Sequence, residues 1–324
     1  MSTKLVTVVG ATGQQGQAVI AAFTNNPAYR VRGLTRNPSS AAAKSLAAQG
    51  VEVVKADLTD FDTVAAAFKD SHIIYAVTDF WALYQKDGYE VARDTERQQG
   101  FNMVKAAAGV PTLEHYIWST LAKSTKKYPV YHFDGKFDVD KLIRTEYPEL
   151  LKKTTFILVC FYGNNLQVAS LRPYWIETAQ KYVQFITYNP QLNIPFIGDV
   201  KNLTPFIEAI VSSPAEKVKN GALVVASIAQ WTAEKYVVEW ARARGKEVQL
   251  VRISREDYDK LWPWPRWAEE FALMMDYFEN VPPSEWFEPG VRVLTAQDLD
   301  VQPVETMEEF IRAYELPDPS TVTY

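Results

Sequence analysis

A glycine-rich turn near the start of the chain most constrains how this sequence can fold. Residues 10–16 read G-A-T-G-Q-Q-G, directly after the apolar run 4–9 and before the helical pattern 17–23. A strand, a glycine turn and a helix in this order are typical of dinucleotide-binding βαβ units. Gly10 permits the tight turn, Gly13 keeps side chains away from a pyrophosphate, and Gly16 allows close helix–strand packing. The unpaired N–H groups at the helix start would then face the anion.

The rhythm of strands and helices predicts the fold class. Strand-like segments at 4–9, 29–36, 51–55, 72–77, 115–119 and 154–161 alternate with helical patterns. This alternation predicts an α/β Rossmann fold, a doubly wound parallel sheet with helices on both faces. From about residue 164 the rhythm breaks down, and seven of the nine tryptophans lie beyond that point. We expect a cofactor-binding Rossmann domain over 1–163 and a smaller, partly interlocked α/β capping domain over 164–324, which closes a cleft.

Composition excludes several classes of function. The 47% hydrophobic content, the net charge of −5 and the pI of about 5.4 describe a soluble globular protein and argue against a nucleic-acid partner. The first strand starts near Lys4, which leaves no room for a signal peptide, and no apolar run approaches the roughly 18–20 residues of a membrane span. The single cysteine, Cys160, excludes an internal disulfide, and the histidines lack metal-ligand spacing. We expect a cytoplasmic protein with no metal and no membrane partner, in which Cys160 is inert core rather than a reactive thiol.

The end of the second strand indicates which dinucleotide binds. An acidic residue roughly 20 positions beyond the glycine turn would bind the ribose 2′-hydroxyl of NAD. Arg36, followed by Asn37, stands there instead. A guanidinium matches the geometry and charge of a phosphate, although a solvated loop charge is the alternative. The sequence therefore predicts NADP(H) rather than NAD(H).

Residues after the third and fourth strands extend the predicted site. Ligands of a doubly wound sheet lie at the carboxyl ends of its strands. Asp57 and Leu58 are therefore expected to border the adenine. Thr78 and Asp79 are expected to border the nicotinamide half of the cofactor.

Several motifs resemble a known family. The glycine turn resembles that of atypical short-chain dehydrogenases, and segments 35–38, 78–81, 99–102, 132–136 and 161–166 resemble the NmrA-like branch of that superfamily. The resemblance is dense over residues 4–170 and looser to about 315. It implies that Lys136 contacts the nicotinamide ribose, that Tyr162 and Asn165 lie near the nicotinamide, and that Ser119 holds the place of a catalytic Ser or Thr. The cofactor residues expected in all are Gly10, Thr12, Gly13, Gln14, Gln15, Gly16, Arg36, Asn37, Asp57, Leu58, Thr78, Asp79, Lys136, Tyr162 and Asn165.

The residue four positions before Lys136 departs from the short-chain dehydrogenase pattern Tyr-x-x-x-Lys. In that pattern the lysine lowers the pKa of the tyrosine, which passes a proton to the substrate. Here the position holds His132, and neither Tyr131 nor Tyr128 has the required spacing. Three interpretations stay open: His132 or Lys136 donates the proton, the site binds cofactor without turnover, or His132 only packs near the lysine. The candidate catalytic residues are Lys136, His132 and Ser119.

An aromatic segment in the carboxyl half suggests the kind of ligand. Residues 262–267 read W-P-W-P-R-W, which is either a lid for a large flat ligand or a loop packed on its own core. Aromatic residues near positions 80–89 would supply the opposite wall. The expected substrate pocket consists of Phe80, Trp81, Tyr84, Tyr162, Trp264 and Trp267, with Tyr89 nearby.

Two functions fit these features. One is an NADPH-dependent oxidoreductase, or a related cofactor-assisted transformation, acting on a bulky hydrophobic, aromatic or polycyclic small molecule of secondary metabolism. The other is a non-catalytic NADP(H) redox sensor that binds a regulatory protein, since the NmrA-like branch holds both kinds. The aromatic excess favours the enzyme, whereas the missing tyrosine favours the sensor.

Overall fold

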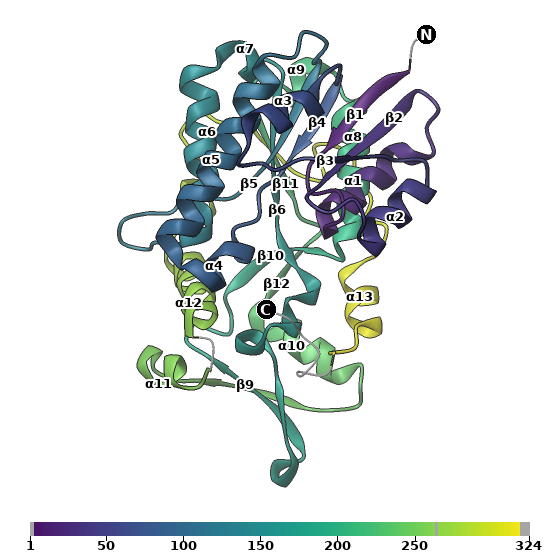
Figure 1. Cartoon of the computed structure of the whole chain (residues 1–324). Helices are drawn as coiled ribbons and strands as arrows, with labels where there is room; N and C mark the ends of the chain where they lie inside the picture. Colours follow the sequence, from purple (N-terminus) through teal and green to yellow (C-terminus); the bar gives the residue numbers. More distant parts are fainter. Residues whose placement is uncertain (1–2, 263–264, 318–324) are drawn as a thin grey trace.

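The computed structural model describes residues 3–262 and 265–317. Its centre is an eight-stranded, all-parallel sheet in the order β14-β11-β6-β5-β4-β1-β2-β3 (Figure 1). This confirms the predicted α/β doubly wound sheet. The strands are β1 Lys4–Val8, β2 Tyr29–Thr35, β3 Glu52–Lys55, β4 Ile73–Ala76, β5 His115–Thr120, β6 Thr154–Val159, β11 Ala222–Ala226 and β14 Val293–Leu294.

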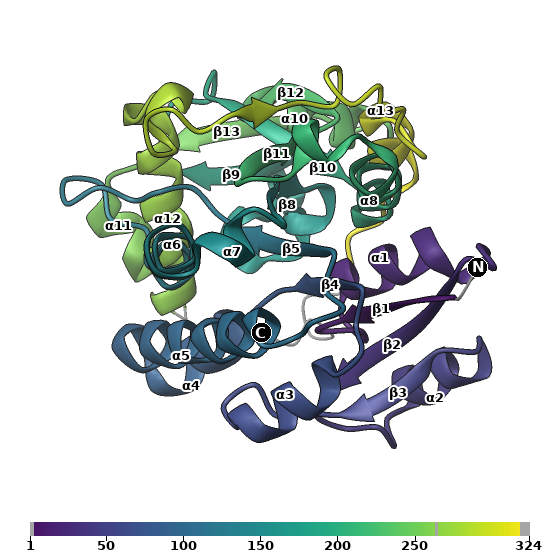
Figure 2. The same ribbon diagram turned by 90° about the horizontal axis from the view of Figure 1, so that it is seen from above.

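Helices cover both faces of the sheet because the central strands are apolar on both sides. Figure 2 shows α1 (Gln14–Thr24) and α8 (Leu203–Ser212) on one side, and α3 (Phe61–Phe68), α5 (Tyr89–Ala108) and α6 (Tyr131–Glu146) on the other. Every residue of β5 and β6 is buried, as expected for strands covered on two faces. Two separate cores result, one for each face. The remaining sheet-associated helices are α2 Ala41–Ala48, α4 Trp81–Asp87, α7 Pro148–Leu151 and α9 Ala215–Val218.

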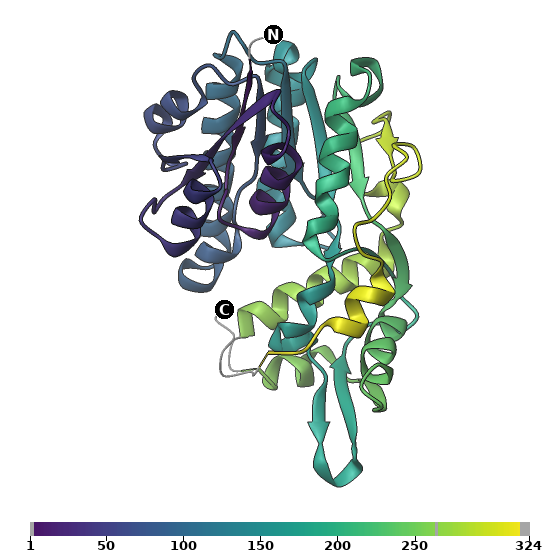
Figure 3. The ribbon, with the colours of Figure 1, turned by 90° about the vertical axis from the view of Figure 1, so that its right-hand side faces the viewer.

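The carboxyl half builds two small sheets beside the carboxyl edge of the main sheet. The first is β12-β10-β7 and the second is β13-β9-β8, whose β8–β9 hairpin projects away from the body in Figure 3. The strands are β7 Phe161–Tyr162, β8 Tyr174–Ile176, β9 Lys181–Ile186, β10 Asn193–Gly198, β12 Ala229–Thr232 and β13 Val248–Arg252. The helices are α10 Ala233–Arg242, α11 Arg255–Lys260, α12 Pro265–Asn280 and α13 Met307–Ala313, with short 3-10 turns η1 Gly163–Gln167, η2 Ala169–Leu171, η3 Glu177–Ala179, η4 Val200–Asn202 and η5 Pro283–Glu285.

The parts expected at 1–163 and 164–324 share the main sheet. Strands β11 and β14 lie beyond residue 163, yet β11 pairs with β6 and β14 pairs with β11. Helix α8, which also lies beyond residue 163, packs on α1. The chain leaves the sheet at Cys160, so the strand expected to reach residue 161 ends at Val159 and β7 starts the first small sheet. Among the described residues, no helix has both the length and the apolar character that crossing a membrane requires.

Helix α6 starts at Tyr131, directly before His132. Its preceding residue, Val130, offers no side-chain cap. Glu270 supplies one from α12, because its Oε1 accepts the backbone N–H of His132 at 2.9 Å. A carboxylate at a helix start is favourable to the helix dipole and satisfies a donor that would otherwise be unpaired. This helix start places both His132 and Lys136 on α6, one turn apart.

Candidate functional site

Two positions of the glycine turn between β1 and α1 strongly favour glycine. Gly10 has φ +64°, a conformation that side chains disfavour. A Cβ at Gly16 would lie 2.2 Å from the carbonyl oxygen of Gly10, so the helix start could not approach the strand. Gly13 caps α1 without a side-chain bond, and the first turn holds no acidic residue. The N–H groups at this helix start are thus open to an anion.

One cavity of about 880 Å³ gathers the residues expected at the cofactor. All fifteen of them line it, from Gly10 in the turn to Asn165 after β7. The three candidate catalytic residues, Ser119, His132 and Lys136, line the same cavity. It follows the carboxyl edge of the sheet, where β1, β2, β3, β4, β5 and β6 end.

At one end of the cleft, Arg36 lies near Asp57, whose carboxylate is hydrogen-bonded within its own loop. Asp57 accepts the backbone N–H of Thr59 at 2.9 Å and its hydroxyl at 2.7 Å. These two bonds are the main reason that the pKa of Asp57 lies below its usual value, and the charge of Arg36 adds to the effect. Arg36 itself is exposed at the rim. Its guanidinium is therefore accessible to a ligand phosphate.

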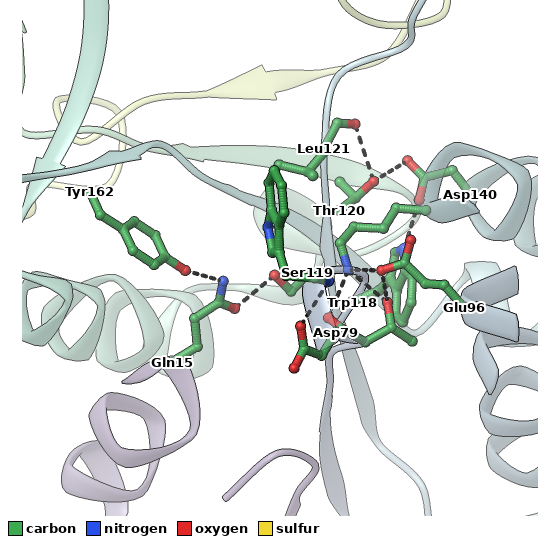
Figure 4. A network of polar contacts seen from close by, with 12 residues as sticks. Gln15, Asp79, Glu96, Trp118, Ser119, Thr120, Leu121, Asp140 and Tyr162 are labelled. Atoms are coloured by element: carbon green, nitrogen blue, oxygen red, sulfur yellow. Dashed lines mark hydrogen bonds and ion pairs between the residues drawn. The ribbon is translucent and has the colours of Figure 1, made fainter. Parts of the chain in front are cut away.

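Lys136 is held inside the cleft by two side chains. Its Nζ donates to Thr78 Oγ1 at 2.6 Å, to the Thr78 carbonyl at 3.0 Å and to Glu96 Oε1 at 2.8 Å. Figure 4 shows Glu96 in this network. The Thr78 hydroxyl in turn donates to Glu96 at 2.8 Å. All three ammonium protons are thus used, so Lys136 presents a fixed positive charge to the cleft.

Glu96 was not predicted from the sequence. It shares the buried face of α5 with Ala92, Gly100 and Met103. A carboxylate in such an apolar row needs a cation, because burying an unpaired charge is costly. The apolar neighbours of Glu96 on this helix face were the feature of the sequence that could have revealed it. They indicate a buried ion pair but do not identify the partner.

Ser119 belongs to a second network, centred on Gln15. Gln15 Oε1 accepts the hydroxyls of Ser119 at 2.8 Å and of Tyr75 at 2.6 Å. Gln15 Nε2 donates to the Tyr162 hydroxyl at 2.7 Å, and Figure 4 shows Gln15 between Ser119 and Tyr162. Burial raises the pKa of Tyr162 to about 12. The network therefore ties the glycine turn to β5 and β7 through neutral groups.

His132 makes a short contact with an acidic residue. Its Nδ1 lies 2.5 Å from Glu270 Oε1, and both side chains are buried. Tyr131, its neighbour in sequence, stacks instead on Tyr89 with ring centroids 4.1 Å apart. Glu270 was not predicted either, because it lies 138 positions further along the chain.

Aromatic rings form the wall around His132. Phe80, Trp81 and Tyr162 line the cavity. Trp267 and Phe271 stack on Trp81 at 4.3 and 5.3 Å. Tyr84 is buried behind this wall, stacked on Phe80 at 4.9 Å, and donates its hydroxyl to the Arg266 carbonyl.

Helix α12 contributes a further part of the cavity wall. Its lining residues are Phe271, Met274 and Phe278, followed by Trp286. The segment 262–267 is predicted either as a lid for the ligand or as a loop packed on its own core. Its Trp262 lies against Tyr174 and Tyr258, whereas its Trp267 stacks on Trp81. Trp264 lies outside the described residues. The spacing of the α12 residues is helical, which by itself indicates only a buried face.

The thiol of Cys160 is buried. Burial raises the pKa of the Cys160 thiol well above its ordinary value. Within residues 3–262 and 265–317, no group of three or more His, Cys, Asp or Glu side chains is arranged to hold a metal ion.

The glycine turn, the parallel sheet and the cleft along its carboxyl edge define a Rossmann-type dinucleotide-binding protein. The model of the NmrA-like family matches residues 2–311, and the chain belongs to this family.

The chain is also similar to individual proteins of known name. It is 25% identical over 270 residues to the NmrA-like family domain-containing oxidoreductase hkm9 from Aspergillus hancockii, which covers 80% of this chain and 78% of hkm9. The negative transcriptional regulator NmrA in complex with NADP has the same fold, with a TM-score of 0.73, 18% identity and coverage of 97% and 95% of the two chains. The NADPH-dependent quinone oxidoreductase QOR2 from Escherichia coli, in complex with NADPH, gives a TM-score of 0.66 at 19% identity, covering 94% of this chain and 98% of QOR2.

Proposed function

We propose that this protein is an NADP(H)-dependent oxidoreductase that acts on a bulky aromatic or polycyclic small molecule. One observation carries the proposal. A single cavity joins the glycine turn and Arg36 to an aromatic wall that contains His132, whose ring contacts the buried Glu270 behind it. Pockets of roughly 300–1,000 Å³ hold cofactors and drug-sized ligands. The cavity, at about 880 Å³, has room for a dinucleotide and part of a substrate.

The residues present fit a dinucleotide at this place. The approach of Gly16 to Gly10 leaves a cradle that a Cβ would fill, and the start of α1 offers unpaired N–H groups. Arg36 would bind the 2′-phosphate, and Lys136 would contact the nicotinamide ribose. The relative hkm9 is named an oxidoreductase, and NmrA and QOR2 have been solved with NADP and NADPH. These likenesses support the proposed cofactor.

The chain's own residues supply binding, charge and a route for a proton. When bound, NADPH supplies a hydride. The rings of Phe80, Trp81 and Phe271 exclude water and offer flat apolar surface to an aromatic ligand. His132 lies within this wall and is the titratable group placed to exchange a proton with the substrate. A role in the cytoplasm and in secondary metabolism belongs to the same proposal.

Turnover with a graded panel of substrates tests this function. Purified protein is mixed with NADPH and with quinones, aromatic ketones, enones and imines of increasing size, and loss of NADPH absorbance is followed. We expect oxidation of NADPH with large aromatic compounds and little with acetone-sized ones. Tight NADPH binding with no oxidation across the panel would overturn the enzyme and favour the redox sensor.

A further inference from the structure

A single carboxylate oxygen organises the proton-exchanging end of the cleft. Glu270 Oε1 accepts the backbone N–H of His132 at 2.9 Å and lies 2.5 Å from Nδ1 of its ring. The exposed fractions are 8% for the His132 side chain and 0% for that of Glu270. Glu270 comes from α12 and His132 from α6, so the contact joins the cap to the Rossmann part. The same oxygen therefore fixes both the start of α6 and the orientation of the ring.

This contact decides which ring nitrogen carries hydrogen. An ionised carboxylate only accepts hydrogen bonds, so Nδ1 must be the donor. In the neutral ring, Nε2 is then the unprotonated nitrogen. Apolar rings surround His132, with centroids 4.9 Å away for Trp81, 6.2 Å for Phe80 and 4.7 Å for Phe133. No described residue forms a hydrogen bond with Nε2, which leaves it for a ligand in the cleft.

Lys136 does not offer an equivalent proton. Its three donor positions are occupied by two atoms of Thr78 and by Glu96. Giving a proton to substrate would break one of these bonds and leave Glu96 next to a neutral amine. His132 has no such competing bond at Nε2 among the described residues, so it is the better-placed donor of the two.

We infer that Glu270 is a positioning residue that makes Nε2 of His132 the proton-exchanging atom; this inference rests on the proposed function. In the reduction of a carbonyl group, the substrate carbon receives a hydride with its electron pair from NADPH. The carbon–oxygen π bond breaks toward oxygen, and that oxygen takes the proton from Nε2 of the imidazolium. The products are the alcohol, NADP⁺ and neutral His132, and water returns the proton. The carboxylate charge of Glu270, whose Oε1 lies 2.5 Å from Nδ1, stabilises the imidazolium.

The ring tautomer can be measured without any substrate. Long-range ¹H–¹⁵N spectra of ¹⁵N-histidine-labelled protein distinguish Nδ1–H from Nε2–H rings. The chain holds three histidines, and His132→Asn assigns the signal. His72 is an internal control with the opposite tautomer, because its Nδ1 accepts the backbone N–H of Leu5. We expect Nδ1–H at neutral His132, and an Nε2–H ring there would overturn the proposal.

Kinetics test what Glu270 does in turnover. In Glu270→Gln the amide oxygen still accepts both hydrogen bonds, so the fold is retained while the charge is lost. We expect kcat to fall at least about tenfold with the NADPH Kd unchanged within about twofold. Glu269→Gln, on the same helix, is the matched control and should keep kcat within about twofold. Wild-type kcat in Glu270→Gln would overturn the proposal. Failure of wild-type protein to oxidise NADPH would instead overturn the proposed function, with the tautomer still deciding the positioning.

Discussion

The carboxylate of Glu96 lies 2.8 Å from the ammonium of Lys136, and both side chains are buried although they belong to different helices. Removing one partner of such a pair leaves an uncompensated charge in the interior. Glu96→Ala should therefore lower the free energy of unfolding by about 3–5 kcal/mol. The exposed pair Lys4–Glu114 is the control, and Glu114→Ala should cost less than about 1 kcal/mol. Denaturant unfolding measures both changes in the free energy of unfolding. Equal losses in the two variants would contradict a buried Glu96–Lys136 ion pair.

Loss of the Ser119 hydroxyl should lower kcat less than loss of the Lys136 ammonium. Ser119→Ala removes one of the two hydroxyls that Gln15 Oε1 accepts, and Tyr75 keeps the other bond. We expect its kcat to fall less than about tenfold. Lys136→Ala removes the only charge that neutralises Glu96 among the described residues and should lower kcat by about a hundredfold or more. Rates are compared per folded protein, checked by circular dichroism, and the reverse order would refute these assignments.

Alanine substitutions at two glycines of the turn should have different effects, one on stability and the other on NADPH binding. A Cβ at Gly16 would lie 2.2 Å from the Gly10 carbonyl, so Gly16→Ala should destabilise the fold by about 2–3 kcal/mol. At Gly13 the closest approach to that carbonyl is 3.3 Å, which a small shift accommodates. Gly13→Ala should stay within about 1 kcal/mol of wild type but weaken NADPH binding about tenfold or more, because the methyl group faces the phosphates. Thermal unfolding and NADPH titration separate the two effects; undiminished affinity in Gly13→Ala would place the phosphates elsewhere.

Stability should depend on pH through Asp140. Burial raises the pKa of this carboxyl to about 7 from 3.8, against the lowering effect of its bond from the Thr120 hydroxyl. Between these two values the folded chain holds the proton that the unfolded chain has lost, so the contribution of Asp140 to stability falls as pH rises and is constant above about 7. Asp140→Asn removes this dependence.

The change can be read from denaturant unfolding at pH 5 and pH 8. The free energy of unfolding of wild type minus that of Asp140→Asn should be about 2–3 kcal/mol more favourable to wild type at pH 5 than at pH 8. Taking the difference cancels the titration of other groups. No change in the difference between the two pH values would show that Asp140 titrates as an exposed carboxyl does.

The fold and the cofactor half of the site could be predicted because their signals are local. The glycine turn, the strand ends and the residues that follow them are each contained in a few adjacent positions. The parallel sheet then brings these strand ends together, as the shared cavity shows. The strand order past β6 was not predictable in this way, since β11 returns to the main sheet from within the carboxyl half.

The acidic partners could not be predicted because they act across long stretches of chain. Glu96 is 40 positions from Lys136, and Glu270 is 138 positions from His132. A sequence shows that a buried carboxylate needs a partner but not which cation reaches it. The α12 wall was missed for a related reason: helical spacing of Phe271, Met274 and Phe278 indicates a buried face without showing that a ligand cavity borders it.

Titration of both reduced cofactors against wild type and Arg36→Ala tests the central claim most directly. A charge-assisted bond to the 2′-phosphate is worth about 1.5–3 kcal/mol, so wild type should bind NADPH about ten- to a hundredfold more tightly than NADH. Arg36→Ala should lose this preference while its NADH affinity stays unchanged within about twofold. Equal affinity for the two cofactors in wild type, or an unchanged preference in Arg36→Ala, would contradict the assignment of this cleft to NADP(H).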